Sequence, residues 1–486
     1  MIFLQKIKTI ISSTSIQYVS ISYLSYTLTF VNSLLLANFL SVFFFGIYQF
    51  ILLVSQYLSY SNLGISYSLG VVLAAKKNNP SLSSVVWHTA FRINLYCAII
   101  IIISNIILIT AFPNMMYKYN YVNHSLGIIL IALISNANTL FSNLYRTYSC
   151  FFKINLQQFI PPASLLILII VKQENTSIDD IIKVSIIGNL FPMIIYFYRA
   201  PLKLSLFSKI KKSIVYTLIR RGTTLLLHNL SFSFIIIASA TIVSMFFAVE
   251  IFAQYRFAQS ISSIAIMAIS SFVFMFYSKI LNRLTYKSNF EAESFIMTMN
   301  EVYVKAMDFV SFLLLIVCPI IQFGFEKYSP MLNVFKLLIV AKIITNQVSV
   351  YSMFMTARKK ESYLAKYGFI AIGLVVILGL IVAWAGLQHE YVALSVVIAS
   401  IYYSLRVLYK STDMLNVISF QQFVLHIFNY RLIVPILSIC VSAVMNEHLF
   451  TPILCVIMFF FLNYPSVKTL YIAGKKMIFD KSILEF

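Results

Sequence analysis

The sequence predicts an all-α polytopic membrane protein, with about 14 transmembrane helices at the usual length of a crossing. Of its 486 residues, 60% are hydrophobic and 10% are charged, whereas soluble domains carry about 25% charged residues. The mean hydropathy is +0.89. Helices and short connections use almost the whole chain, so little remains for a domain outside the membrane. These values exclude a soluble enzyme.

Apolar runs divided by short polar breaks define the individual helices, because a crossing needs about 20 mostly apolar residues. In the first half we expect helices at residues 10–36, 43–74, 83–112, 125–145, 157–172 and 181–198. In the second half we expect them at 222–247, 254–281, 302–324, 331–356, 366–386, 391–409, 431–446 and 451–470. The first run follows Lys6 and Lys8 without a small-residue cleavage site, so we expect it to remain as a span.

A basic stretch at residues 199–221 lies near the middle of the first twelve spans and predicts two six-helix bundles. The expected domains are an N-terminal bundle at 1–200, a cytoplasmic basic linker at 201–221, a C-terminal bundle at 222–410, and two additional helices with a cytoplasmic tail at 411–486. An offset of 207 residues places Phe39 on Phe246 and Val42 on Val249, in the tight turn after the first helix of each half. Such parallel repeats are a common transporter plan.

Basic residues outnumber acidic ones by 36 to 15, which gives a net charge of +21. With the N-terminus inside, roughly 27 of them fall in cytoplasmic connections and about four in outer ones. Membrane topology therefore accounts for the charge, and we expect both termini in the cytoplasm and no nucleic-acid partner. The five cysteines stand singly in apolar stretches, a pattern that indicates neither a disulfide framework nor a metal site.

A cation near the centre of a span costs about 2.5–3.5 kcal/mol, so a basic residue inside a span is by default a functional candidate, and five basic residues are candidates here. Lys342 is the deepest of them, and Arg92 and Arg256 are the other expected cavity cations. The competing interpretation of Arg256 is that it snorkels to the outer interface, which is also what we expect of Lys336. Lys305 is the fifth, and its spacing of three residues from Asp308 favours an ion pair.

Uncharged polar residues follow some of these helices at helical spacing and predict the lining of the same cavity, although Ser and Thr often serve helix packing instead. The expected lining residues are Ser25, Thr29, Gln49, Gln56, His88, Gln259, Asn346 and Ser349. Deep cations outnumber deep anions, so the cavity should prefer an anion. The candidates for proton or sodium coupling are Asp308, Glu250 and His228. We expect no catalytic residues, no metal and no other cofactor.

The first two predicted helices carry a resemblance in the segments LLLANFLSVFFFGIYQF at residues 34–50 and YLSYSNLGISYSLG at 57–70. They resemble the N-terminal signature of bacterial polysaccharide flippases, the Wzx-type O-antigen transporters of the multidrug/oligosaccharidyl-lipid/polysaccharide exporter superfamily. The resemblance implies two six-helix bundles in a V, two further helices, and alternating access to a central cationic cavity. The cavity cations of the family correspond here to Arg92, Arg256 and Lys342.

The resemblance also implies a function. Such proteins move an undecaprenyl-diphosphate-linked oligosaccharide, used for lipopolysaccharide, from the cytoplasmic to the periplasmic leaflet of the bacterial inner membrane. The implied partners are this lipid-linked substrate, membrane lipid, a polysaccharide polymerase and a chain-length regulator. The charge of the substrate suits the predicted cavity, because compact cations neutralise a diphosphate.

Two alternatives remain open. A membrane-embedded oligosaccharide polymerase or glycosyltransferase should display a large outer loop or carboxylates at the membrane edge, and the first outer loop at residues 37–44 contains no acid. Another exporter of the same superfamily, for lipid II or drugs, is the second alternative. The absence of acidic residues from the first span argues against a drug exporter.

Overall fold

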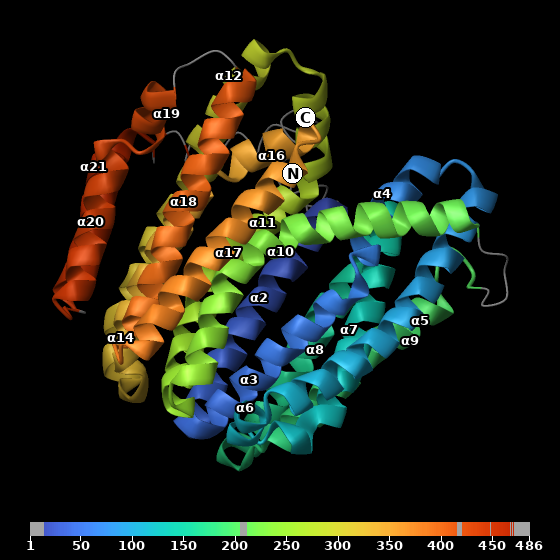
Figure 1. The fold of residues 1–486 in the computed structure, drawn as a ribbon, viewed down its shortest axis with the longest axis horizontal. Coiled ribbons are helices and arrows are strands. Elements are labelled where there is room, and N and C mark those ends of the chain that lie inside the picture. Colours follow the sequence, from blue (N-terminus) through green and yellow to red (C-terminus); the bar gives the residue numbers. More distant parts are fainter. Residues whose placement is uncertain are drawn as a thin grey trace, which may run out of the picture. The chain divides into compact units, whose positions relative to one another are not determined.

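The computed structural model describes residues 14–204, 211–415, 420–447, 449–466, 468 and 470, and the elements assigned in these ranges are helices (Figure 1). Within them, ten helices are long and apolar enough to cross a membrane. Shorter apolar helical segments accompany them at Ile65–Lys76, Tyr430–Val444 and Phe450–Leu462, and at Ser233–Phe246, which is the last part of a longer helix. The predicted all-α polytopic fold class is confirmed.

The chain divides into two compact units, Met1–Asn229 and Leu230–Phe486. The boundary lies inside helix α10, Lys212–Phe246. This helix already begins within the segment 201–221 that the sequence assigned to a linker. Its early start is consistent with the residues between 212 and 221, which contain no proline or glycine to interrupt a helix.

In the part of the first unit that the structure describes, seven helices besides the start of α10 make up most of the fold. They are α2 (Thr14–Phe39), α3 (Val42–Ser59), α4 (Ile65–Lys76), α5 (Pro80–Ala111), α7 (Tyr121–Thr147), α8 (Phe151–Lys172) and α9 (Ile178–Tyr198), with the short α6 (Pro113–Lys118) between α5 and α7. Helix α8 packs against α2 and α9, and α7 packs against α3, α4 and α9. The core of the unit includes Trp87, whose ring lies edge-on to Phe141 at 5.1 Å between centroids.

The single helix predicted for residues 43–74 is wrong, because the chain breaks between α3 and α4. Leu63 and Gly64 adopt left-handed backbone angles, with φ of 51° and 72°. The Asn62 side chain accepts a hydrogen bond from the Gly64 amide at 2.8 Å. Gly64 also lies against α10, where a Cβ atom on it would be 2.0 Å from the Gly222 carbonyl oxygen. The close contact requires glycine.

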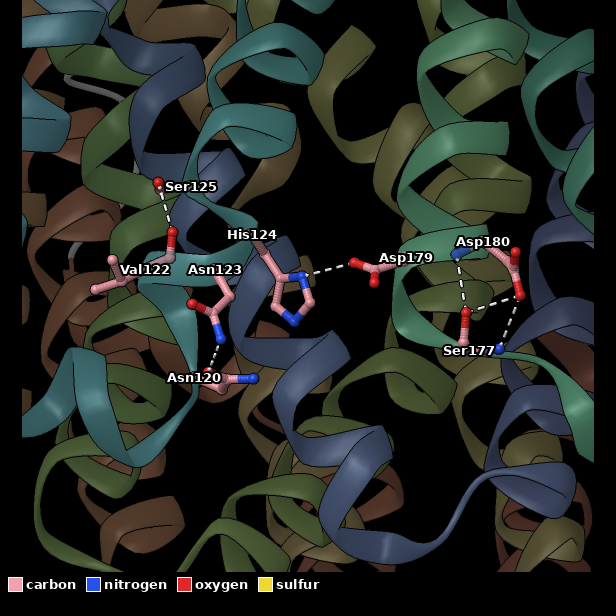
Figure 2. Close-up of polar contacts among 8 residues, drawn as sticks. All are labelled: Asn120, Val122, Asn123, His124, Ser125, Ser177, Asp179 and Asp180. Carbon is pink, nitrogen blue, oxygen red and sulfur yellow. Dashed lines mark hydrogen bonds and ion pairs between the residues drawn. The ribbon is translucent and has the colours of Figure 1, made fainter.

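Polar contacts join the first turns of α7 and α9 and the end of α8. His124 Nδ1 lies 3.1 Å from Asp179 Oδ1, which connects the first turns of α7 and α9 (Figure 2). Ser177 caps α9 by accepting a hydrogen bond from the Asp180 amide, while the Asp180 carboxylate accepts one from the Ser177 amide. Lys172, at the end of α8, pairs with Asp180 at 2.7 Å.

The second unit contains α11 (Val249–Tyr286), α12 (Asn289–Met299), α13 (Lys305–Leu313), α14 (Val317–Gly324), α15 (Leu332–Asn346), α16 (Ser349–Ala357), α17 (Glu361–Trp384), α18 (Glu390–Leu415), α19 (Phe420–Ile427), α20 (Tyr430–Val444) and α21 (Phe450–Leu462). Every residue of α15 is buried. It packs against α11, α13, α18 and α20. Helix α15 is therefore the centre of this unit.

Two predicted helices of the second unit are interrupted. The helix expected at 331–356 is divided into α15 and α16, which meet at Gln347 and Val348. The helix expected at 302–324 begins within a π-helical turn at Asn300–Val304, which joins α12 to α13. Interruptions of this kind free backbone groups inside a membrane and are tolerated where neighbouring helices bury them. Both interruptions lie close to Asp308.

Candidate functional site

Lys342 is buried at the centre of the second unit. Its side chain is 4% exposed, and its ammonium donates a hydrogen bond to the Ser263 hydroxyl of α11 at 2.9 Å. Among the described residues, it pairs with no carboxylate. A cation taken out of water without an anionic partner is costly, so its position points to a role beyond packing.

Arg256 and Lys342 belong to one continuous polar track. Arg256 donates to the side-chain oxygen of Gln259 at 2.6 Å, and the Gln259 side-chain nitrogen donates to the Ile236 carbonyl of α10 at 2.8 Å. Ser263 donates to the Gln259 carbonyl at 2.7 Å and accepts from Lys342. The structure thus connects two of the predicted cavity cations through α11.

A small cavity of about 10 Å³ adjoins the Lys342 side chain, with room for about one water molecule. Its walls come from α10, α15 and α18: Ile235, Ile236, Leu338, Ala341, Lys342, Thr345, Val396 and Ser400. The ammonium is therefore enclosed in this conformation.

Asp308 forms a second buried polar group, on α13. It is fully buried and accepts a hydrogen bond from the side-chain nitrogen of Gln347 at 2.8 Å. Lys305 Nζ lies 3.9 Å from its other oxygen, so the expected ion pair is present. Gln347 was not among the predicted site residues, although it directly follows the predicted Asn346 and an amide side chain inside a span is the same signal that identified Gln49.

Lys336 does not snorkel, contrary to expectation. It is 1% exposed, and its ammonium donates to the Ser442 hydroxyl at 2.8 Å, the Ser442 carbonyl at 3.2 Å and the Glu447 carbonyl. These acceptors lie at the turn between α20 and α21, which covers this side of α15. The sequence of α15 alone contained no sign of that covering turn.

Glu447 organises the same turn. Its carboxylate accepts hydrogen bonds from the amides of Leu449, Phe450 and Thr451, the last at 2.8 Å. Burial acts to raise the pKa of Glu447, but the hydrogen bonds from Thr451, Phe450 and Leu449 outweigh it and lower the pKa to about 2. The turn that holds Lys336 is thus itself held by a carboxylate at the start of α21.

Arg92 and His88 lie one turn apart on α5 in the first unit. His88 is buried, and its Nε2 is 2.9 Å from the Ser84 hydroxyl. Arg92 is half-buried. The predicted spacing on one helical face is present, and the site belongs to a different unit from Lys342.

The remaining predicted residues are spread over both units. Ser25 and Gln49 are buried, Gln56 is half-buried, and Thr29 is exposed with its hydroxyl bonded to the Ser25 carbonyl at 2.9 Å. In the second unit Asn346 is buried, and Ser349 donates to its carbonyl at 2.8 Å. Glu250 is exposed in the first turn of α11. The side chain of His228 and both chain ends, 1–13 and 471–486, lie outside the described residues.

Gln158 was missed as a site residue and connects α8 to α2. It accepts a hydrogen bond from Ser22 at 2.8 Å and donates one to the Tyr18 hydroxyl at 3.4 Å. Asn32 of α2 donates to the Pro162 carbonyl at 2.7 Å. The polar stripe of the first helix thus makes several contacts with α8, as expected of residues that stabilise helix packing in membranes.

Comparison with known proteins identifies the fold and not a family. No protein-family model and no curated protein matches the chain. Among solved structures, an inward-facing multidrug resistance MATE family transporter of the MOP superfamily matches with a TM-score of 0.64 and 11% identity, covering 84% of this chain and 99% of that one. The lipid II flippase MurJ, in an inward closed conformation, matches with a TM-score of 0.63 and 14% identity, covering 94% and 99%.

A third match is a MOP superfamily transporter from Pyrococcus furiosus, whose binding pocket is described as reversed in polarity. It has a TM-score of 0.53 and 11% identity and covers 83% of this chain and 95% of that one. The likeness extends over most of the chain in all three cases. This multi-pass membrane protein therefore has the fold of MOP superfamily transporters.

Proposed function

We propose that this protein is a flippase for an undecaprenyl-diphosphate-linked oligosaccharide, such as an O-antigen repeat unit, which it moves from the cytoplasmic to the periplasmic leaflet. The proposed route is a cationic cavity used by alternating access. The observation that carries the proposal is the buried ammonium of Lys342, whose partner among the described residues is a hydroxyl and not a carboxylate. A cation in that state favours an anionic ligand.

The chemistry of the track suits such a ligand. The diphosphate brings about two negative charges, which the ammonium of Lys342 and the guanidinium of Arg256 can neutralise. Gln259 and Ser263 supply hydrogen-bonding groups of the kind that sugar hydroxyls need. Arg92 and His88 are the proposed contribution of the first unit.

Enclosure of Lys342 supports a cycle with two states. The adjoining cavity holds about one water, so the ligand reaches the ammonium only after α10, α11, α15 and α18 move apart. Alternating access requires a site that is open in one state and closed in another. The conformation described here corresponds to a closed state of this site.

Transport requires a driving force, and we propose Asp308 as the coupling residue for a proton or sodium ion, ahead of Glu250 and His228. Asp308 is buried beside two helix interruptions, where a change in its charge would alter the contact with Gln347. The membrane potential also assists outward movement of an anion, by about 2.3 kcal/mol per charge per 100 mV. In Asp308→Asn, the rate of transport should no longer respond to an imposed proton or sodium gradient. A response equal to that of wild type would exclude Asp308 as the coupling residue.

The proposed setting is the bacterial inner membrane, with both termini in the cytoplasm. A polysaccharide polymerase and a chain-length regulator would act on the repeat unit after it is flipped, in lipopolysaccharide synthesis. The chain itself would need no catalytic residue, metal or other cofactor, because flipping makes and breaks no bond.

The deciding experiment is the leaflet location of the lipid-linked oligosaccharide in cells that lack this gene. Wild type should move single repeat units to the periplasmic leaflet, whereas Lys342→Met, which keeps the side-chain volume, should leave them on the cytoplasmic leaflet at normal protein abundance. Lys360→Met, an exposed cation, serves as the matched control. If cells that lack the gene instead accumulate unpolymerised repeat units on the periplasmic leaflet, the polymerase or glycosyltransferase alternative is correct.

Another exporter of the same fold is the second candidate, favoured by the similar TM-scores of the MATE transporter and MurJ. The same strains separate it from the flippase proposal. Drug resistance or lipid II movement that depends on Lys342, with normal oligosaccharide export, would support this candidate.

A further inference from the structure

A groove lies between α18 and α19 in the second unit, and it shares no lining residue with the polar track. Its volume is about 640 Å³, within the usual range for small-molecule sites. Its walls are Tyr402, Leu405, Arg406, Tyr409, Phe420, Gln421 and Val424. The α18 residues recur at a spacing of three and four and so form one face of the helix.

The groove is an apolar channel with one charged group. Arg406 is the sole charged residue among its described walls, and its Cζ lies 5.6 Å from the centre of the Tyr402 ring. Arg406 is exposed, so its guanidinium is accessible at the groove. Tyr409 and Phe420 meet edge to face at 5.4 Å and hold α19 against α18. An apolar wall beside a guanidinium suits a ligand with a hydrocarbon chain and an anionic head.

Arg406 lies close to one surface of the membrane. It is 16 residues after Glu390, the first residue of α18, which corresponds to about 24 Å along a helix. The hydrocarbon core is about 30 Å thick, so Arg406 is placed near its far edge. The distribution of basic residues makes that edge cytoplasmic. Anionic lipid is concentrated in the cytoplasmic leaflet, and basic pockets between helices on that side bind anionic head groups.

We propose that this groove binds one anionic phospholipid of the cytoplasmic leaflet. The phosphate contacts the Arg406 guanidinium, and an acyl chain lies along Leu405 and Val424. The Gln421 side chain at the rim is available to the head group. This site is separate from the proposed transport track. The lipid proposal therefore does not depend on which substrate the protein transports.

The test is native mass spectrometry of the full-length protein in detergent, titrated with phosphatidylglycerol or phosphatidylethanolamine. Wild type should retain one phosphatidylglycerol in preference to phosphatidylethanolamine. Arg406→Gln should weaken the retention of phosphatidylglycerol roughly tenfold, as expected for the loss of a charge-assisted hydrogen bond, while Arg406→Lys should keep most of it.

Arg220 provides a matched control. It too is exposed and lies over a tyrosine four residues earlier, with its Cζ 5.9 Å from the Tyr216 ring, but it lines no part of this groove. Arg220→Gln should therefore leave the retention of phosphatidylglycerol unchanged. Equal losses in Arg220→Gln and Arg406→Gln would show general attraction to basic residues and overturn the proposal.

A second variant tests the groove and not the charge. Val424→Trp should fill it and reduce retention of phosphatidylglycerol with Arg406 intact, at an unchanged melting temperature. Equal retention of both lipids by wild type would overturn the proposal, as would unchanged retention in Val424→Trp. Displacement of the bound lipid by a short prenyl diphosphate at a lower concentration than phosphatidylglycerol would also overturn it, in favour of the transported lipid as occupant.

Discussion

Ser41 and Ala248 occupy the same backbone position in the two halves of the chain, 207 residues apart. Ser41 precedes α3 with φ and ψ of −62° and 155°, and Ala248 precedes α11 with −58° and 158°. The helices before them end at Phe39 and Phe246, at the same offset. The turn is therefore repeated, but only the Ser41 hydroxyl accepts a hydrogen bond from its helix, from the Phe44 amide at 3.3 Å.

The missing cap at Ala248 predicts a stabilising substitution. Ala248→Ser should raise the free energy of unfolding by about 0.5–2 kcal/mol, because a serine at this position can satisfy an amide of the first turn. Ser41→Ala should lower it by a similar amount. Both residues are exposed, so packing changes little. Thermal unfolding in detergent, followed by fluorescence, should show shifts of opposite sign; shifts of the same sign would contradict the shared geometry.

Gly64 should tolerate no side chain. Gly64→Ala adds a Cβ 2.0 Å from the Gly222 carbonyl oxygen and also forces alanine into a φ of 72°, so we expect loss of folded protein. Gly386→Ala has a φ of 65° and open space, and should cost about 1–2 kcal/mol for the backbone alone. Gly373→Ala has neither feature and should be neutral or stabilising. Size-exclusion profiles and melting temperatures measure the stability of the three variants. Equal stability of all three would contradict the close contact between Gly64 and Gly222.

Lys336 should stabilise the attachment of α20 and α21. Lys336→Met removes the ammonium that donates to Ser442 and Glu447. The two carbonyls keep a donor each, the Glu447 amide and the Ser442 hydroxyl, so the expected loss is the net contribution of a hydrogen bond from a charged donor, about 1.5–3 kcal/mol. We expect a lower melting temperature and faster proteolysis between α20 and α21. The exposed Lys360→Met should change neither property. A melting temperature equal to that of wild type would mean that Lys336 contributes no net stability here.

The low pKa of Glu447 should make the folding stability of the protein depend on pH. Its folded-state pKa of about 2 lies below the ordinary value of about 4.3, so its stabilising contribution is complete above the ordinary value and is lost as the pH falls toward 2. Glu447→Gln should therefore be less stable than wild type at pH 7, and the difference should shrink between about pH 4 and pH 2. Melting temperatures across this range provide the measurement. A difference that is constant with pH would contradict the proposed carboxylate cap.

Apolar runs were enough to locate the long helices of the fold, because a span must satisfy its backbone internally and bury about 20 apolar residues. They did not predict the short helices α6, α12 and α19. They could not locate the interruptions at Leu63–Gly64 and Gln347–Val348, since each depends on a contact with another helix or on burial by one. Helical spacing placed Arg256 and Gln259 on α11, and the structure adds Ser263 as their connection to Lys342.

The sequence by itself determined that this is a polytopic helical membrane protein with a repeated turn and an excess of cations in its spans. Those properties follow from local composition and from the cost of exposing backbone or charge to lipid. Only the tertiary structure decided what each cation contacts. Lys336 and Lys342 lie six residues apart on one helix, yet one is bound to the turn before α21 and the other to Ser263, because different helices cover the two faces of α15.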